Sequence, residues 1–119
     1  MNDEVVVLRA PARFKLAELA RLAEPVLQRA GALRAVAFGS FARGAADGYS
    51  DLDLAVVLRT ELPAFGRGEL LKDLFDALPV GLDLVVYTPE EFERGMQARM
   101  GVFDAIAREG VTIYERAEG

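Results

Sequence analysis

The 119-residue chain contains no cysteine and no histidine. The absence of cysteine excludes disulfide bonds, thiolate nucleophiles and cysteine-based zinc sites. The absence of histidine leaves carboxylates, lysine, tyrosine or water as the general bases that the chain can use. Any metal site must therefore be built from oxygen ligands, and such sites suit hard cations such as Mg²⁺ or Mn²⁺.

Positive charge is also scarce, because 14 Lys and Arg stand against 19 Asp and Glu, for a formal net charge of −5. A protein that grips long nucleic acid needs a clustered basic surface, so this class of function is disfavoured. A nucleotide remains compatible with the charge, since divalent cations can hold its phosphates.

Long hydrophobic runs are missing as well. No apolar stretch approaches the roughly 20 residues that cross a bilayer. The N-terminus carries Asp3 and Glu4, and no basic segment there precedes an apolar run. We therefore expect a cytoplasmic protein with no membrane association.

The chain does contain enough apolar material for a packed core, with 52% hydrophobic residues. Its length fits one domain. We predict a single domain over residues 1–119, in which an N-terminal strand and helix occupy 1–31 and the core occupies 33–115.

Apolar periodicity and turn residues predict a mixed α/β fold with a sheet of about four strands flanked by helices. Pro25 lies inside the first expected helix and is predicted to kink or split it. Residues 60–68 are expected to form a loop, because they hold Pro63, Gly66 and Gly68. Helices are expected at 12–30, 69–78, 89–100 and 102–109, and strands at 4–9, 33–38, 52–58, 80–87 and 111–115.

Two aspartates stand at the start of the strand expected at 52–58. Asp51 and Asp53 are separated by one residue, so on a strand their side chains point to the same face. Two like charges this close are unfavourable unless a cation lies between them. Asp83 is the one charged residue of the strand expected at 80–87, and burying a lone carboxylate is costly unless it is paired or bound to metal. If the two strands are neighbours, the three carboxylates can surround one or two divalent cations, as expected for phosphoryl or nucleotidyl transfer.

A short turn follows the strand expected at 33–38. Gly39 allows the backbone to approach a phosphate closely, and the exposed N–H groups of the turn favour an anion. The Ser40 hydroxyl can donate to a phosphate oxygen, Arg43 projects from the same turn, and Gly44 is placed to end it. For the turn to serve the acids, the strands before and after it must be antiparallel neighbours.

Each part also has a purely structural interpretation. A Gly-Ser pair is a common step from strand to turn, and Asp51 and Asp53 can be solvated acids at the start of a strand. Asp83 can pair with an arginine, Arg43 can be solvated, and Ser50 can be a hydroxyl at the start of a strand. The combination of these features favours a nucleotide site far more than any one of them.

Together these residues resemble the motif of the DNA polymerase β-like nucleotidyltransferase superfamily. The short chain resembles the minimal nucleotidyltransferase (MNT) group within it, over roughly residues 33–114. The residues that carry the resemblance are Gly39-Ser40-x-x-x-Gly44, then Ser50-Asp51-x-Asp53-Leu54, then Asp83 on a third strand.

The resemblance implies Mg²⁺-dependent transfer of a nucleoside monophosphate from a nucleoside triphosphate to an acceptor hydroxyl, with Mn²⁺ as an alternative metal. Asp51 and Asp53 are implied as metal ligands. Asp83 is implied as a ligand of the catalytic metal that also helps to activate the acceptor.

The same resemblance assigns the nucleotide contacts. Gly39 and Ser40 are implied to hold the triphosphate of ATP, and Arg43 and Ser50 are further candidate contacts.

MNT proteins are commonly partnered with HEPN-domain proteins in toxin–antitoxin pairs, in which the MNT protein is the antitoxin and can adenylylate a tyrosine of its partner. The resemblance therefore implies a HEPN-domain partner and a hetero-oligomer. Two alternatives stay open. One is a nucleotidyltransferase that modifies a small molecule such as an antibiotic, although the short chain leaves little to build an acceptor pocket. The other is a non-catalytic antitoxin that acts by binding alone.

Overall fold

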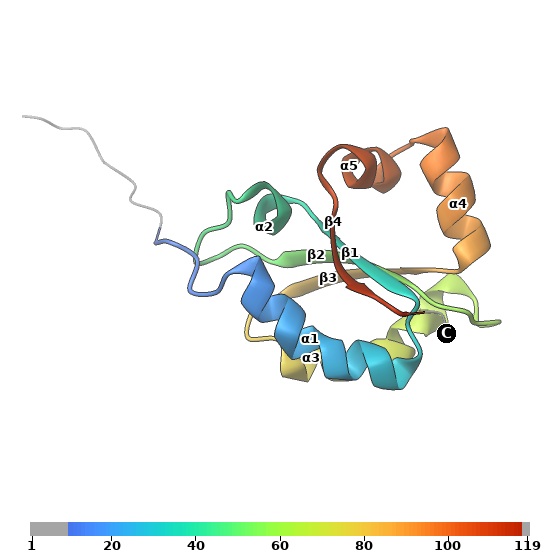
Figure 1. The fold of residues 1–119 in the computed structure, drawn as a ribbon, viewed down its shortest axis with the longest axis horizontal. Helices are drawn as coiled ribbons and strands as arrows, with labels where there is room; N and C mark the ends of the chain where they lie inside the picture. The colour runs from blue at the N-terminus through green and yellow to red at the C-terminus, as the bar shows by residue number, and fades with distance from the viewer. Residues whose placement is uncertain (1–9, 118–119) are drawn as a thin grey trace, which may run out of the picture.

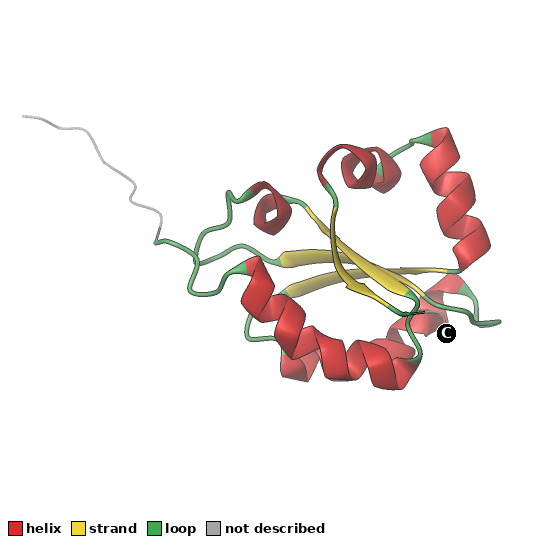
Figure 2. Cartoon of the chain, viewed as in Figure 1, coloured by secondary structure: helices red, strands yellow, loops and turns green. Residues whose placement is uncertain are grey.

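The computed structural model describes residues 10–117, so the strand predicted over 4–9 lies outside the described residues. The described chain forms one four-stranded sheet flanked by helices (Figure 1; Figure 2). This arrangement confirms the predicted mixed α/β class. The elements are α1 (Leu16–Ala30), β1 (Arg34–Phe38), α2 (Ser40–Arg43), β2 (Leu52–Val57), η1 (Ala64–Leu71), α3 (Asp73–Ala77), β3 (Leu82–Tyr87), α4 (Pro89–Ala98), α5 (Val102–Glu109) and β4 (Val111–Glu115).

The strands lie in the order β3-β2-β1-β4. β1 pairs antiparallel with β2 and with β4, and β2 pairs parallel with β3. The two neighbour relations that the predicted site requires, β1 with β2 and β2 with β3, are therefore both present. β2 is an inner strand and is buried at every position except the half-buried Asp53, as expected from its nearly continuous apolar sequence.

Helices cover both faces of the sheet (Figure 1). α1, η1 and α3 pack on one face, where Leu52, Leu54 and Val56 of β2 meet them. α4 and α5 pack on the other face, where Ala55 and Val57 contribute. Within the described residues, no helix is both long enough and apolar enough to cross a membrane.

α1 is one continuous helix, so of the two outcomes predicted for Pro25, a kink or a split, the split is wrong and the kink stays a prediction. Pro25 lies on the exposed face, where water can bond the carbonyl left without an N–H partner. The helix is held from its other side by the buried Leu19, Ala23 and Leu27. Gly31 ends it at a φ of 77°, a left-handed conformation that favours glycine.

The segment after β2 differs most from the sequence-based expectation. The loop predicted over 60–68 and the helix predicted over 69–78 are replaced by the 3-10 helix η1 and the short helix α3. Leu71 and Leu74 are buried, whereas Phe75, which lies four residues after Leu71 and would share its face in one continuous helix, is 52% exposed.

Arg67 explains why η1 forms. Its side chain is buried, with Nε donating to Leu62 O at 2.9 Å and Nη1 donating to Val86 O at 3.1 Å. The guanidinium also pairs with Glu91, through Nη1 to Oε1 at 2.6 Å and Nη2 to Oε2 at 3.2 Å. A single side chain therefore ties η1 to β3 and to the first turn of α4, contacts that no local sequence pattern encodes.

Glu91 completes a capping box with Thr88 at the start of α4, since Thr88 N–H donates to Glu91 Oε1 at 2.8 Å and Glu91 N–H donates to Thr88 Oγ1 at 3.2 Å. The hydrogen bonds from Arg67, followed by the bond from the Thr88 backbone, lower the pKa of Glu91 from 4.5 to about 2. An acid whose folded-state pKa is lowered adds stability above its unfolded-state pKa and loses it as the pH falls towards the folded-state value.

We therefore expect the Glu91→Gln variant to lose about 1–2 kcal/mol of unfolding free energy at pH 7, a value kept small because the carboxylate is partly exposed. The difference from the wild type should be complete above pH 4.5 and shrink towards pH 2. Urea denaturation at a series of pH values measures it.

Lys72→Ala is the matched control, because the Lys72–Glu69 pair is exposed and spans 4.0 Å. Its effect should stay within about 0.5 kcal/mol at every pH. A pH-independent loss in Glu91→Gln would contradict the assignment of this stability to the Arg67–Glu91 pair.

Candidate active site

The end of β1 and the start of β2 lie side by side. Phe38 pairs with Asp53 across the antiparallel strands, so Gly39, the next residue, lies beside the Asp53 carboxylate. The contact is close, because a Cβ atom added to Gly39 would collide with Asp53 Oδ2. The turn predicted to bind phosphate and Asp53, a predicted metal ligand, are therefore in contact.

β3 brings a second acid to this place. Asp83 lies directly opposite Asp53 in the parallel pairing, and opposite residues of neighbouring strands project to the same face. The face is the one that α4 and α5 cover further along, but its end stays open, with Asp53 half-buried and Asp83 exposed. The apolar sequence around Asp83 predicts that its side chain is buried. This prediction is wrong, because β3 is an edge strand and Asp83, near its start, is exposed to solvent.

Asp51 lies just before β2 and is exposed. Its carboxylate rests against Gly81, where an added Cβ would collide with Asp51 Oδ1, and the neighbouring Leu52 N–H donates to Gly81 O at 2.8 Å. As the side chains stand, no three acidic groups within residues 10–117 converge to hold a metal ion together. Joint metal binding by the three aspartates stays a prediction, and it requires their side chains to come closer together than they stand.

The electrostatics at the corner of the sheet formed by Gly39, Asp53 and Asp83 favour a cation. Burial raises the pKa of the Asp53 carboxyl above its usual value, and the nearby Asp83 and then Asp51 raise it further, while Arg43 opposes them. The carboxylates therefore repel one another more than the chain's own basic groups attract them. This excess of negative charge and the oxygen-only donor set fit a hard divalent cation, which Asp51, Asp53 and Asp83 would hold.

The turn after β1 has the predicted form. α2 is a single helical turn that begins at Ser40 and ends at Arg43, with Gly44 as its C-cap. Gly39 and Gly44 have φ values of 76° and 72°, a region that glycine enters at the least cost. The predicted contacts of Gly39 and Ser40 with a triphosphate stay predictions.

Arg43 does not stand free at this turn. Its Nη1 donates to both carboxylate oxygens of Glu109, at 3.2 and 3.1 Å, and the Gly39 N–H donates to Glu109 Oε1 at 3.2 Å. The sequence reasoning missed Glu109. One signal was available, since an acid in the last turn of a helix is disfavoured by the helix dipole and needs a compensating partner.

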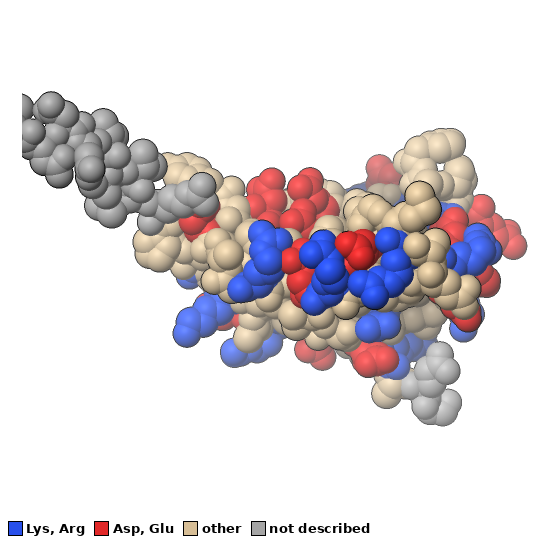
Figure 3. Space-filling view, turned by 90° about the horizontal axis from the view of Figure 1, so that it is seen from above, with Lys and Arg blue, Asp and Glu red and all other residues tan. Residues whose placement is uncertain are grey.

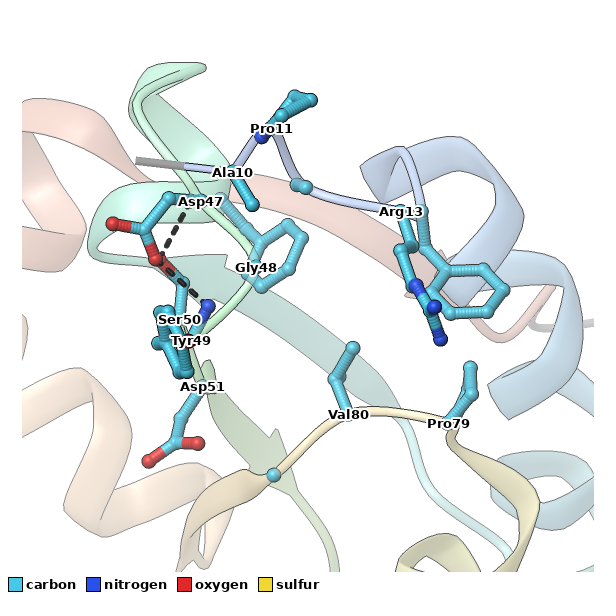
Figure 4. A pocket seen from close by; sticks show the side chains of 14 residues that line it. Ala10, Pro11, Arg13, Asp47, Gly48, Tyr49, Ser50, Asp51, Pro79 and Val80 are labelled. Carbon is cyan, nitrogen blue, oxygen red and sulfur yellow. Dashed lines mark hydrogen bonds between the residues drawn. The ribbon is translucent and has the colours of Figure 1, made fainter. Parts of the chain in front are cut away.

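Ser50 has a local role in the turn before β2. Its hydroxyl accepts from the Asp47 N–H at 2.9 Å and donates to Asp47 Oδ1 at 3.2 Å, while the Tyr49 N–H donates to the same Oδ1 at 2.9 Å (Figure 4). The structure thus places Ser50 in a turn network, and a nucleotide contact by Ser50 stays a prediction without support from this geometry.

A cavity of about 470 Å³ adjoins Asp51. The turn that carries Asp51 lies on one side of it, and Arg13, Pro79 and Val80 lie on the other (Figure 4). The segment before α1 lines the cavity and is attached to the turn before β2, since Pro11 forms an isolated β-bridge with Asp47 and the Gly48 N–H donates to Ala10 O at 2.8 Å. The candidate site therefore has a neighbouring hollow large enough for an organic group.

The two glycines of the turn allow a matched test of the Gly39–Asp53 contact. Gly44→Ala adds a Cβ that meets nothing within 4 Å, so we expect only the cost of the left-handed backbone, about 1–2 kcal/mol. Gly39→Ala has a larger backbone cost, because φ 76° with ψ −154° is open almost only to glycine, and it also displaces the Asp53 carboxylate, so its loss of unfolding free energy should be larger. Equal losses for both variants, measured by urea denaturation, would contradict the close contact.

Comparison with known proteins identifies the family. The sequence model of the nucleotidyltransferase domain matches residues 19–108. The match begins inside α1, earlier than the resemblance read from the motifs alone, and it includes every predicted site residue. No curated protein matches the chain.

Solved structures share the fold. A protein described as a minimal nucleotidyltransferase is 32% identical, with 84% of this chain and 97% of that chain covered and a TM-score of 0.58. A toxin–antitoxin structure with AMP-PNP is 22% identical, with 82% and 73% covered and a TM-score of 0.59. A structure of a tri-AMPylated Shewanella oneidensis HEPN toxin in complex with an MNT antitoxin is 20% identical, with 82% and 71% covered and a TM-score of 0.53.

The two toxin–antitoxin structures, at 22% and 20% identity, show a similarity of fold alone. The domain match spans most of the chain, and the relative at 32% identity is covered almost completely. The strand pairing that gathers Gly39, Asp53 and Asp83 at one corner is in keeping with both findings. This chain belongs to the nucleotidyltransferase domain family.

Proposed function

We propose that this nucleotidyltransferase transfers AMP from ATP to a hydroxyl group of a partner protein, and that the partner is a HEPN-domain toxin for which the chain is the antitoxin. The observation that carries the transfer site is the position of Asp53 between the Gly39 turn and Asp83. The partner is inferred from the toxin–antitoxin complexes among the structures that share the fold.

In the proposed reaction the acceptor oxygen attacks the α-phosphorus of ATP. A bond forms between that oxygen and phosphorus, the bond between the α-phosphorus and the bridging oxygen to the β-phosphorus breaks, and pyrophosphate leaves with the bonding electrons. Divalent cations, when bound, neutralise the triphosphate and lower the pKa of the attacking hydroxyl.

The chain's own residues have distinct tasks in this proposal. Asp51 and Asp53 hold the cation and so orient the triphosphate. Asp83, exposed beside Asp53, binds the catalytic cation and receives the proton of the hydroxyl on a carboxylate oxygen. The Gly39–Ser40 turn and Arg43 bind the phosphates furthest from the reacting centre.

The transfer is tested with ATP labelled at the α-phosphate, Mg²⁺, the chain and a HEPN-domain protein. We expect label on the partner, and a loss of roughly 100-fold or more in Asp53→Asn and Asp51→Asn, because removing a group that stabilises the transition state costs this much. The control is Asp76→Asn, an exposed acid of α3 away from the site. Full transfer by both site variants would refute the mechanism.

The same acids predict a stability effect. Since burial, and after it the nearby like charges, raise the pKa of Asp53, neutralising it in Asp53→Asn should leave the melting temperature without divalent cation unchanged or higher. Adding Mg²⁺ or Mn²⁺ should raise the melting temperature of the wild type and of Asp76→Asn, and raise it less in Asp53→Asn. A lower cation-free melting temperature in Asp53→Asn, with an intact response to cation, would contradict the assignment.

The cavity beside Asp51 favours a second candidate function, the modification of a small molecule. At about 470 Å³ it could hold an acceptor without help from a partner protein. Nucleotide transfer to an antibiotic by the chain alone, with no labelling of a HEPN-domain protein, would favour this candidate.

The non-catalytic alternative is separated by a different experiment. A double variant, Asp51→Asn with Asp53→Asn, should fail to neutralise the toxin if transfer is the mechanism. Neutralisation by the double variant in the absence of ATP would indicate an antitoxin that acts by binding alone.

A further inference from the structure

Glu109 joins the end of α5 to both ends of the turn that the proposed function assigns to phosphate binding. It is the last residue of α5, and its carboxylate accepts hydrogen bonds from the backbone of Gly39 and from the side chain of Arg43. Gly39 stands before α2 and Arg43 ends it, so Glu109 holds both ends of the turn that carries Ser40.

The pair differs from an ordinary surface salt bridge. Arg43 is 51% exposed, but Glu109 is only 21% exposed and has the Gly39 backbone N–H as a second donor. Glu109 also lies where the helix dipole opposes its charge, so the contact to Arg43 compensates an unfavourable position. Figure 3 shows basic and acidic side chains alternating on this face of the molecule.

The geometry of the contact leaves part of Arg43 available. Both Glu109 oxygens accept from Nη1, and among the described residues neither Nη2 nor Nε of Arg43 donates a hydrogen bond. The charge of Arg43 also reaches Asp53, where it opposes the rise in pKa that burial and the nearby acids cause. The guanidinium therefore pairs with Glu109 near the candidate metal ligands and keeps a donor edge free.

We propose that Glu109 is a positioning residue for the triphosphate, which fixes the Gly39 backbone and pre-orients Arg43 so that its free donor edge meets the phosphates. A half-exposed arginine loses side-chain freedom when it binds an anion, and that cost weakens binding. Glu109 removes much of the cost in advance. The inference rests on the proposed function, because it needs the turn to bind phosphate.

The test measures binding of inorganic tripolyphosphate and of Mg-ATP to the full chain by calorimetry, together with KM and kcat for the transfer. We expect Glu109→Ala to raise the Kd for tripolyphosphate and the KM for ATP about 5- to 10-fold, with kcat changed far less. Glu109→Gln keeps an acceptor for the Gly39 N–H and should fall between the wild type and Glu109→Ala. It also keeps the test valid if the alanine variant folds poorly.

Two comparisons distinguish positioning from a general charge effect. In an Arg43→Ala background the Glu109→Ala change should have a clearly smaller effect than in the wild type, since only the hydrogen bond to the Gly39 backbone is then lost. Asp104→Ala removes a carboxylate from the same helix, one that pairs with Arg99 and Arg108, and should leave the Kd unchanged.

Tighter binding of tripolyphosphate by Glu109→Ala would overturn the inference, because it would make Glu109 a competitor of the phosphates. Full additivity of the Glu109 and Arg43 changes would overturn it too. Failure of the wild type to bind either tripolyphosphate or Mg-ATP would instead overturn the proposed function, which separates the two results.

Discussion

The pairing of β2 with β1 on one side and with β3 on the other is the constraint on which the site depends. It places Asp53 beside Gly39 and opposite Asp83, although these residues come from three separate segments. Side chains alternate along a strand, so a shift of either pairing by one residue would send one carboxylate to the other face. The buried residues on either side of Asp53 prevent such a shift, because Leu52 and Leu54 belong to the core beneath α1.

Repulsion between carboxylates is not fully compensated at the corner formed by Gly39, Asp53 and Asp83. Asp53 is half-buried near two other acids. Arg43 opposes the rise that these acids cause in the Asp53 pKa, but it also forms an ion pair with Glu109. Uncompensated charge of one sign at the open end of a sheet is characteristic of binding sites rather than of structural ion pairs. By contrast, the buried Arg67 is fully engaged with Glu91 and two backbone carbonyls, and it stabilises the opposite end of β3.

The family implied by the motifs is the family that the domain match supports, and the reason lies in the chemistry of the motif. A glycine that must adopt a positive φ, a serine after it and two acids one residue apart are each replaceable in a structural role. Together, at this spacing, they predict a site for metal and phosphate. The chain carries no comparable motif for its partner or its acceptor. Both are therefore inferred from similar proteins and have to be tested by experiment.

Local sequence determined most of the elements. The apolar pattern of β2, the glycine that ends α1, the capping box at Thr88 and the turn from Gly39 to Gly44 depend on neighbours along the chain, and each was predictable. Only the tertiary structure decided that Pro25 is tolerated, that Arg67 ties η1 to β3 and α4, that Asp83 is exposed and that Glu109 reaches the turn after β1. These outcomes depend on which residues distant in sequence meet, and on which strand lies at the edge of the sheet, and local periodicity carries no information about either.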